Sequence, residues 1–327
     1  FLAGGSVRDA IVGHQSKDYD FVARGATVDQ IIEHCGHYGK AVLAGEKRFA
    51  VIKFYPDGSD EEIDIALPRT EKSNGEGYRD FDIVTDPNLS IDEDLKRRDF
   101  TFNAMALDVA NGELTDPHNG KKDLLNGVVR FVGNPDKRLE EDLSRMLRGI
   151  RFAIKYHFTL DSDASDAITK HSDRINEKTN DDEWKVAREK IGQEFLKMIE
   201  ANPIKALEML DSTGLLEHAL PEFNRLKIVE QNLEYHPEGD VYTHTSMMLE
   251  KLPDDASMEL KLSVLFHDVG KYTAVQMTFK KEGPHPYKPG VTVAAGERID
   301  ITDPEDFFGS EKYDPALHRS QNIGHDK

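Results

Sequence analysis

Two aspartates, Asp18 and Asp20, stand two residues apart in a stretch that reads Lys-Asp-Tyr-Asp-Phe-Val. Residues two apart on a β-strand point to the same face of the sheet, so these carboxylates would lie side by side. Carboxylates that close repel each other, and a bound divalent cation is the usual way to keep both ionised. The spacing predicts a metal site; the simpler alternative is a surface turn followed by a solvated acidic strand.

Two further features suggest what such a metal would act on. Gly4-Gly5 predicts a tight turn that leads into a short helix over residues 6–12, and a glycine turn at a helix start offers backbone N–H groups to phosphate oxygens. Asp64 alternates with isoleucines in Ile-Asp-Ile-Ala, which predicts a neighbouring strand. Three carboxylates on adjacent strands are what two-metal phosphoryl transfer requires.

Four motifs follow one another along the first 150 residues. They are Gly4-Gly5-x-x-Arg8-Asp9, Asp18-x-Asp20, Arg97-Arg98-Asp99-x-Thr101-x-Asn103 and Glu141-Asp142-x-x-Arg145-x-x-Arg148. With these motifs in this order and at this spacing, the chain resembles the class II tRNA nucleotidyltransferases, the CCA-adding enzymes of the polymerase β superfamily, over roughly residues 1–200. The Arg69-Thr70-Glu71-Lys72-Ser73 run and the stretch over residues 89–99 are similar to the bacterial members.

The resemblance implies an activity and a set of roles. The activity is addition of CCA to the 3′ end of tRNA from CTP and ATP, by two-metal nucleotidyl transfer without a template. Asp18 and Asp20 would bind two Mg²⁺ ions, and Asp64 would help to activate the 3′-hydroxyl of the primer. A loop at residues 75–78 would assist the switch from C to A addition. The other nucleotide-binding residues are Gly4, Gly5 and Arg8 at the triphosphate, Arg97 and Arg98 at the triphosphate and ribose, Asp99 and Asn103 at the sugar and the turn, and Arg148.

Base selection without a template must come from side chains. Asp142 and Arg145 are three apart in a predicted helix, so they are expected to project from one face and brace each other. Their acceptor and donor match the edges of cytosine and adenine and oppose those of guanine and uracil, at about 1–3 kcal/mol for each failed contact. The alternative is an exposed ion pair on an amphipathic helix. Lys190 replaces an arginine of the family and loses bidentate geometry, so we leave it out of the site.

A second motif lies downstream. His267-Asp268-x-Gly-Lys, with His244 upstream, resembles the HD phosphohydrolase signature of some bacterial CCA-adding enzymes. The resemblance implies a metal site formed by His244, His267 and Asp268, and such ligands suit Ni²⁺, Mn²⁺ or Co²⁺. HD domains normally complete the site with a distal aspartate, which the sequence does not place, and the domain is expected to be incomplete at its C-terminal end. His285, His318 and His325 are candidates only for substrate or second-metal contacts.

Composition limits the setting. The chain has 327 residues, a net charge of −19 and one cysteine, Cys35, which excludes an internal disulfide and suits a reducing cytoplasm. No apolar run approaches the ~18 residues of a membrane span, so no membrane partner is expected. The negative charge opposes RNA binding unless basic residues cluster locally, as they do over residues 137–155. The chain begins at Phe1 without a methionine, and a short upstream segment is expected. The oligomeric state stays open.

The predicted fold class is α+β. A polymerase β-like nucleotidyltransferase head with a mixed sheet is expected over residues 1–133, an all-α neck and body with the base-selecting helix and a tRNA-binding surface over 134–220, and a partial helical HD-type domain over 221–327. The alternatives are a bacterial poly(A) polymerase, to which residues 45–49 have a weak likeness, or a CC-adding enzyme. A tRNA-binding scaffold without catalysis is the alternative of another class.

Overall fold

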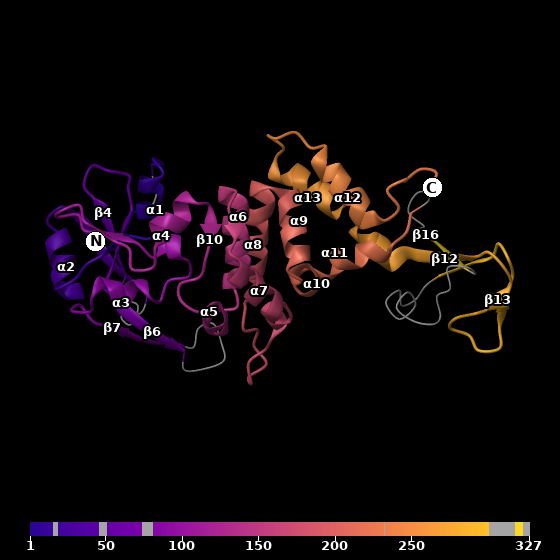
Figure 1. Ribbon diagram of the computed structural model, residues 1–327, viewed down its shortest axis with the longest axis horizontal. Helices are drawn as coiled ribbons and strands as arrows, with labels where there is room; N and C mark the ends of the chain where they lie inside the picture. The colour runs from indigo at the N-terminus through magenta and orange to yellow at the C-terminus, as the bar shows by residue number, and fades with distance from the viewer. Residues whose placement is uncertain (16–18, 46–50, 74–80, 232, 301–317, 323–327) are drawn as a thin grey trace. The chain divides into compact units, whose positions relative to one another are not determined.

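The computed structural model describes residues 1–15, 19–45, 51–73, 81–231, 233–300 and 318–322 (Figure 1). Asp18, the loop at 75–78 and most of residues 45–49 therefore lie outside the described residues, as does His325. The chain divides into two compact units, Phe1–Phe195 (unit 1) and Leu196–Lys327 (unit 2). The boundary falls inside helix α8 (Arg188–Ala201), and the three-domain division stays a prediction.

A seven-stranded sheet forms the first part of unit 1, in the order β3-β4-β5-β2-β1-β8-β9. Strands β2 and β5 run parallel and the other neighbours antiparallel, which confirms the predicted mixed sheet. The alternation of apolar and polar residues along β2 and β5 is typical of half-buried strands. The strands are β1 (Leu2–Ala3), β2 (Tyr19–Val22), β3 (Gly39–Ala44), β4 (Val51–Pro56), β5 (Ile63–Ala66), β8 (Ala106–Leu107) and β9 (Leu114–Thr115).

Short helices and one hairpin surround this sheet. Helix α2 (Val28–Cys35) begins with a capping box between Thr27 and Gln30, and its buried Ile31 and Cys35 pack in one cluster with Ile52 of β4. A second cluster of buried side chains, including Leu95 and Val132, lies near β1 and β2. The remaining elements are α1 (Gly5–Ile11), hairpin strands β6 (Arg69–Ser73) and β7 (Phe81–Thr85), α3 (Ile91–Leu95), the 3₁₀ turn η1 (Thr101–Asn103) and α4 (Gly120–Leu125).

The second part of unit 1 is mainly helical. Helix α6 (Arg145–Tyr156) has an apolar face that is fully buried at Met146 and Ile150. Buried aromatic rings from η1 and from α6 pack edge to face, among them Phe102 and Phe152 at 5.3 Å between centroids, and link the sheet to the helices. The other elements are β10 (Val128–Val129) paired with β11 (Thr159–Leu160), α5 (Pro135–Glu141), α7 (Ser162–His171) and η2 (Ser172–Asn176).

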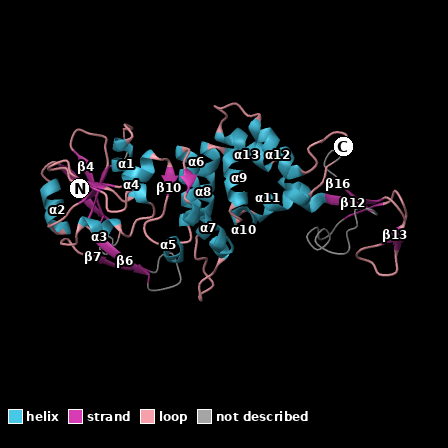
Figure 2. Cartoon of the chain, viewed as in Figure 1, coloured by secondary structure: helices cyan, strands magenta, loops and turns pink. Residues whose placement is uncertain are grey.

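Unit 2 begins as helices and ends as strands (Figure 2). Its helical part was predicted, but from Val275 the described residues form an antiparallel sheet in the order β15-β12-β16, so the prediction of a helical domain over 221–327 is wrong for that stretch. The β-branched and aromatic residues of Val-Gln-Met-Thr-Phe favour a strand. In the described part of the chain, every helix is too short or too polar to cross a membrane. The elements are α9 (Pro203–Ser212), α10 (Leu215–Ala219), α11 (Pro221–Arg225), η3 (Leu226–Ile228), α12 (Val241–Glu250), α13 (Met258–Phe266), η4 (Val269–Ala274), β12 (Val275–Phe279), β13 (Gly283–Pro284), β14 (Thr292–Val293), β15 (Arg298–Asp300) and β16 (His318–Asn322).

Candidate active site and histidine cluster

The glycine turn lies where the first strand meets helix α1. Gly4 has a φ of +71°, a backbone conformation that favours glycine, and a Cβ at this position would lie 2.5 Å from Nη1 of Arg98, so a larger residue would displace that guanidinium. The Gly4 amide donates to the carbonyl of Met105 at 3.1 Å. That amide therefore already has a hydrogen-bond partner within the protein, and the turn lies close to the guanidinium group of Arg98.

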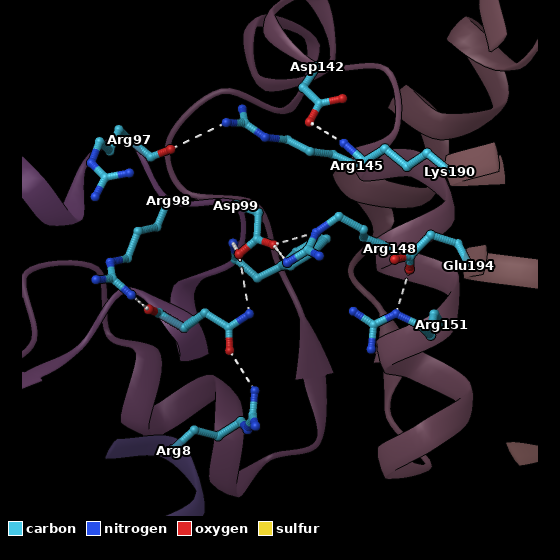
Figure 3. A network of polar contacts seen from close by, with 12 residues as sticks. Arg8, Arg97, Arg98, Asp99, Asp142, Arg145, Arg148, Arg151, Lys190 and Glu194 are labelled. Carbon is cyan, nitrogen blue, oxygen red and sulfur yellow. Dashed lines mark hydrogen bonds and ion pairs between the residues drawn. The ribbon is translucent and has the colours of Figure 1, made fainter. Parts of the chain in front are cut away.

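A continuous chain of hydrogen bonds links helix α1 to helix α6 (Figure 3). Arg8 donates from Nη1 to Oδ1 of Asn103 at 2.8 Å, and Asn103 donates from Nδ2 to Oδ1 of Asp99 at 3.2 Å. Arg148 closes the chain with bonds from Nε and Nη2 to Oδ2 of Asp99, at 3.0 and 2.6 Å. Burial alone raises the pKa of Asp99, but the Arg148 charge and these hydrogen bonds bring the pKa below its usual value.

A buried aspartate that we did not predict positions the arginine pair. Asp94 of α3 is fully buried, and its Oδ1 accepts from Nε of Arg97 at 3.0 Å and from the backbone amide of Arg69 at 3.1 Å. Its Oδ2 lies 3.6 Å from Nη2 of Arg98. Burial lowers the pKa of Arg98 although Asp94 opposes the shift. One carboxylate therefore holds two predicted nucleotide-binding residues and an edge of the hairpin.

The predicted placement of Asp142 and Arg145 on one helix face is wrong. Helix α5 ends at Glu141, Asp142 has an extended backbone, and α6 begins at Arg145, so the two residues do not share a helix face. Arg145 instead donates from Nη1 to Glu141 at 2.7 Å and from Nη2 to the Arg97 carbonyl at 3.3 Å. Asp142 lies 3.3 Å from Nζ of Lys190 on α8. The Asp-x-x-Arg spacing fits a helical pair, but the chain breaks the helix between them.

Lys190, which we had left out of the site, therefore supports one of the predicted site residues through its ion pair with Asp142. Burial raises the pKa of Asp142, while the Lys190 charge, hydrogen bonds from Ser144 and the charge of Arg145 lower it below its usual value. A lysine lacks the bidentate geometry of an arginine, but its single ammonium group still neutralises the half-buried carboxylate. The sequence feature that could have identified Lys190 is its position, which is where the family has an arginine.

All ten predicted nucleotide-binding residues line one cavity of about 450 Å³ in unit 1, together with Asp20. Arg69 and Phe152, to which we had given no role, also line it. Six arginines face three aspartates in this lining, so the cavity carries an excess of three positive charges in a chain of net charge −19. Guanidinium groups bind phosphate oxygens with directed hydrogen bonds, so the lining is suited to a polyphosphate anion.

The predicted metal ligands divide between described and undescribed residues. Asp20 of β2 is paired in register with Asp64 of the parallel strand β5, so both side chains lie on the same face of the sheet. Asp20 is exposed and lines the cavity, whereas Asp64 is not among the lining residues and lies 3.3 Å from Nζ of Lys53. Carboxylates on one sheet face fit a hard divalent cation such as Mg²⁺. Asp18 lies outside the described residues.

A histidine cluster in unit 2 contains the predicted HD residues. Ligand atoms of His244, His267 and Asp268 lie within 4.8 Å of one another, and so do those of His236, Glu238 and His244. We did not predict His236 or Glu238. Burial raises the pKa of Glu238, but hydrogen bonds from its own backbone and from both histidines lower it to about 2. The sequence feature that could have identified both residues is the short His-Pro-Glu-Gly-Asp run before α12.

Comparison with known proteins gives the class of the chain and then its family. Residues 1–130 match the model of the poly A polymerase head domain, and residues 157–227 match the "probable RNA and SrmB-binding site of polymerase A". The multifunctional CCA protein of Neisseria meningitidis serogroup A is 36% identical over 273 residues, which cover 83% of this chain and 61% of that protein. That of Laribacter hongkongensis is 32% identical over 304 residues, which cover 92% of this chain and 70% of that protein.

Solved structures agree in fold. The CCA-adding enzyme of Bacillus stearothermophilus in complex with CTP aligns with a TM-score of 0.59 and 23% identity, over 82% of this chain and 58% of that one. The Thermotoga maritima enzyme complexed with tRNA-CCA aligns with a TM-score of 0.53 and 22% identity, over 83% and 65%. The chain belongs to the family of the multifunctional CCA proteins, and it spans about three fifths of the length of the Neisseria relative (61%). Nucleotidyltransferases of this kind use divalent metal ions.

Proposed function

We propose that this chain adds CCA to the 3′ ends of tRNA, using CTP and ATP and no nucleic-acid template. One observation carries the proposal: a single arginine-rich cavity contains both the glycine turn and the two separately anchored side chains, Asp142 and Arg145. The first set suits a triphosphate, and the second offers an acceptor and a donor to the edge of a base. A tRNA substrate would place the enzyme in the cytoplasm.

The roles of the residues follow from their contacts. Arg8, Arg97 and Arg98 would bind the triphosphate, and the Asn103–Asp99–Arg148 chain would hold the ribose side of the cavity rigid. Asp18 and Asp20 would hold Mg²⁺, and Asp64 would help to orient the primer 3′-hydroxyl. When bound, the two ions would lower the pKa of that hydroxyl and neutralise the leaving pyrophosphate.

Base selection would use Asp142 and Arg145 on independent supports. Lys190 holds Asp142, and Glu141 holds Arg145, so each side chain can meet the base without losing its own partner. Cytosine and adenine both present an amino donor beside a ring nitrogen acceptor. Guanine and uracil present the reverse pattern, so both contacts would fail together.

The test is the product made from a tRNA that ends at its discriminator base. The purified protein is incubated with this tRNA, Mg²⁺, CTP and ATP, and the extended 3′ end is sequenced, with the Asp20→Ala variant as control. We expect CCA from the wild type and no extension from the variant. A product ending in CC, or a poly(A) tail, would identify the CC-adding or poly(A) alternative. Binding of tRNA without extension would identify the scaffold.

We also propose a second activity, metal-dependent phosphohydrolysis, in unit 2. The convergence of His244, His267 and Asp268 within 4.8 Å supports it, because two imidazoles and one carboxylate suit a first-row transition metal. A metal at this position would activate water for attack on a phosphate ester. The assay uses 2′,3′-cyclic nucleotides and phosphate esters with Ni²⁺, Mn²⁺ and Co²⁺ in turn. Absence of hydrolysis with every metal would leave the His-Asp pair a packing feature.

A further inference from the structure

The two central histidines of the unit 2 cluster are each held through one ring nitrogen. Nδ1 of His267 lies 2.7 Å from the carbonyl oxygen of Val264, one turn earlier in α13. Nδ1 of His244 lies 2.5 Å from Oε1 of Glu238, in the loop before α12. The supporting group is therefore a backbone carbonyl on one side of the cluster and a carboxylate on the other.

These supports fix the tautomer of both rings. A carbonyl oxygen and an ionised carboxylate can only accept hydrogen bonds, so the Nδ1 atoms of His267 and His244 must both carry the proton. In the neutral ring the other nitrogen, Nε2, then keeps its lone pair. Nε2 of His267 lies 3.1 Å from Oδ2 of Asp268, and the ammonium group of the buried Lys271 lies 2.7 Å from that same oxygen. Lys271 is thus the existing counter-charge of the carboxylate, while the ring lone pair of His267 also faces it. A metal ion between ring and carboxylate would bind lone pairs of both.

The loop before α12 places Glu238 with little freedom. Gly239 has a φ of +96° and donates to the carbonyl of His236 at 3.1 Å, while its own carbonyl accepts from the amide of Gln231 at 2.7 Å. Asp240 caps α12 by accepting from the Thr243 amide at 2.8 Å. His244 follows one turn later, so cap and loop together set the distance between carboxylate and imidazole.

We propose that Glu238 is the positioning carboxylate of a transition-metal centre in unit 2, holding His244 so that its Nε2 joins Nε2 of His267 and Asp268 as a ligand. Outer carboxylates of this kind orient a ligating histidine and raise its basicity. The inference goes beyond nucleotidyl transfer and rests on the metal centre of the second proposed activity. It differs from the alternative in which Glu238 itself ligates the metal together with His236 and His244.

His236 separates these two arrangements. Its Nδ1 lies 3.2 Å from the same Oε1 of Glu238, and its ring packs edge to face against His244 with centroids 4.9 Å apart. In the proposed arrangement His236 only shares the carboxylate, so its removal leaves the His244 hydrogen bond intact. In the alternative, His236 is a ligand and its removal costs as much as the loss of His244.

The experiment measures metal affinity of the full chain by equilibrium dialysis with Mn²⁺, Co²⁺ or Ni²⁺ alone, and follows the visible spectrum of the Co²⁺ form. We expect Glu238→Ala to weaken binding about 10–100-fold. Glu238→Gln should weaken it by less than about tenfold, because the amide oxygen still accepts from Nδ1. His236→Ala should have a similarly small effect, and His244→Ala should remove binding. Glu222→Ala, which changes an exposed glutamate of the same unit, is the matched control.

Three results would overturn the proposal. Affinity unchanged in Glu238→Ala, with binding lost in His244→Ala, would keep the centre and remove Glu238 from it. Equal losses in Glu238→Gln and Glu238→Ala, together with a large loss in His236→Ala, would make Glu238 a ligand. No binding by the wild type would remove the centre itself. Circular dichroism of each metal-free variant checks the fold, and should Glu238→Ala fail to fold, Glu238→Gln and His236→Ala still decide the question.

Discussion

The cavity of unit 1 and the histidine cluster of unit 2 are both rich in polar and titratable groups, but the cavity is lined mainly by hydrogen-bond donors and the cluster mainly by acceptors. In the cavity, guanidinium donors surround the carboxylates, as where Arg148 makes two hydrogen bonds to Asp99. In the cluster, acceptors bind the Nδ1 side of the imidazole rings, as where Glu238 accepts from Nδ1 of His244. The cavity is left with donors in excess and the cluster with lone pairs.

This difference teaches what each centre can bind. Excess donors and an excess of three positive charges suit an anion such as a nucleoside triphosphate. Converging lone pairs suit a cation that is softer than Mg²⁺, because imidazole nitrogen ranks with the ligands of Zn²⁺, Ni²⁺ and similar ions. Each variant below should therefore affect one centre and leave the other intact, or the comparison fails.

The largest expected effect is at the head. Asp20→Ala removes a carboxylate from an exposed strand position, so the fold should persist while incorporation of CTP and ATP falls by at least about a thousandfold, since metal ions supply several kcal/mol to such reactions. The measurement is single-turnover extension of tRNA at saturating Mg²⁺. Asp60→Ala, an exposed aspartate in the turn before β5, is the matched control. Turnover near that of the wild type would remove Asp20 from the mechanism.

The reciprocal change is at the cluster. Asp268→Ala should abolish hydrolysis of 2′,3′-cyclic nucleotides in the presence of Ni²⁺, Mn²⁺ or Co²⁺, because it removes the only carboxylate of the proposed ligand set. CCA addition should stay within about twofold of the wild type, because the cavity is built wholly from unit 1 residues. Both activities are measured on one preparation. A parallel loss of CCA addition would show that the two centres are coupled.

Much of the cavity could be predicted from the sequence because its residues lie in motifs of fixed spacing. Gly4, Arg8 and Asn103 come from such motifs and meet at one place. The supports could not be predicted in this way. Asp94 is an ordinary acidic residue in its helix, and only the fold shows that it is fully buried beneath two arginines.

The errors have a common physical cause. Spacing alone implied a helix through Asp142 and Arg145, but the extended backbone at Asp142 interrupts it, and the partner of Asp142 lies 48 residues further on. Glu238 was missed because a loop, not a helical period, brings it to His244. Local patterns predict elements; contacts between distant segments need the tertiary structure.

A stability effect of intermediate size is expected at the Asp99–Arg148 pair. Arg148→Ala leaves Asp99, whose side chain is only 11% exposed, without its main counter-charge. Removing one partner of a buried pair costs about 3 kcal/mol or more, so the free energy of unfolding should fall by roughly that amount. Adding Asp99→Asn to Arg148→Ala should restore part of it. Urea unfolding at pH 7 measures both, and an unchanged midpoint in Arg148→Ala would contradict the argument.

The pH dependence of this pair has a definite sign. The pKa of Asp99 is lowered in the folded protein, so its ionised form is the one that folding stabilises. The contribution is complete above the ordinary carboxyl pKa of about 3.9 and is lost as the pH falls through the lower, folded value. The difference in unfolding free energy between wild type and Asp99→Asn should therefore shrink below about pH 4. A difference that grows on acidification would reverse the assignment.

The smallest effect is expected in base selection. Arg145→Ala should reduce the preference for CTP and ATP over UTP and GTP by about tenfold, since one failed contact costs about 1–3 kcal/mol. The affinity for triphosphate should change less, because five arginines remain in the cavity lining. Arg138→Ala is the matched control: Arg138 contacts the same Glu141 at 2.9 Å but does not line the cavity. Competition between labelled nucleotides gives the selectivity of each variant. Intact selectivity in Arg145→Ala, or an equal loss in Arg138→Ala, would show that Glu141 and its partners only stabilise the junction of α5 and α6, and that bases are chosen elsewhere in the cavity.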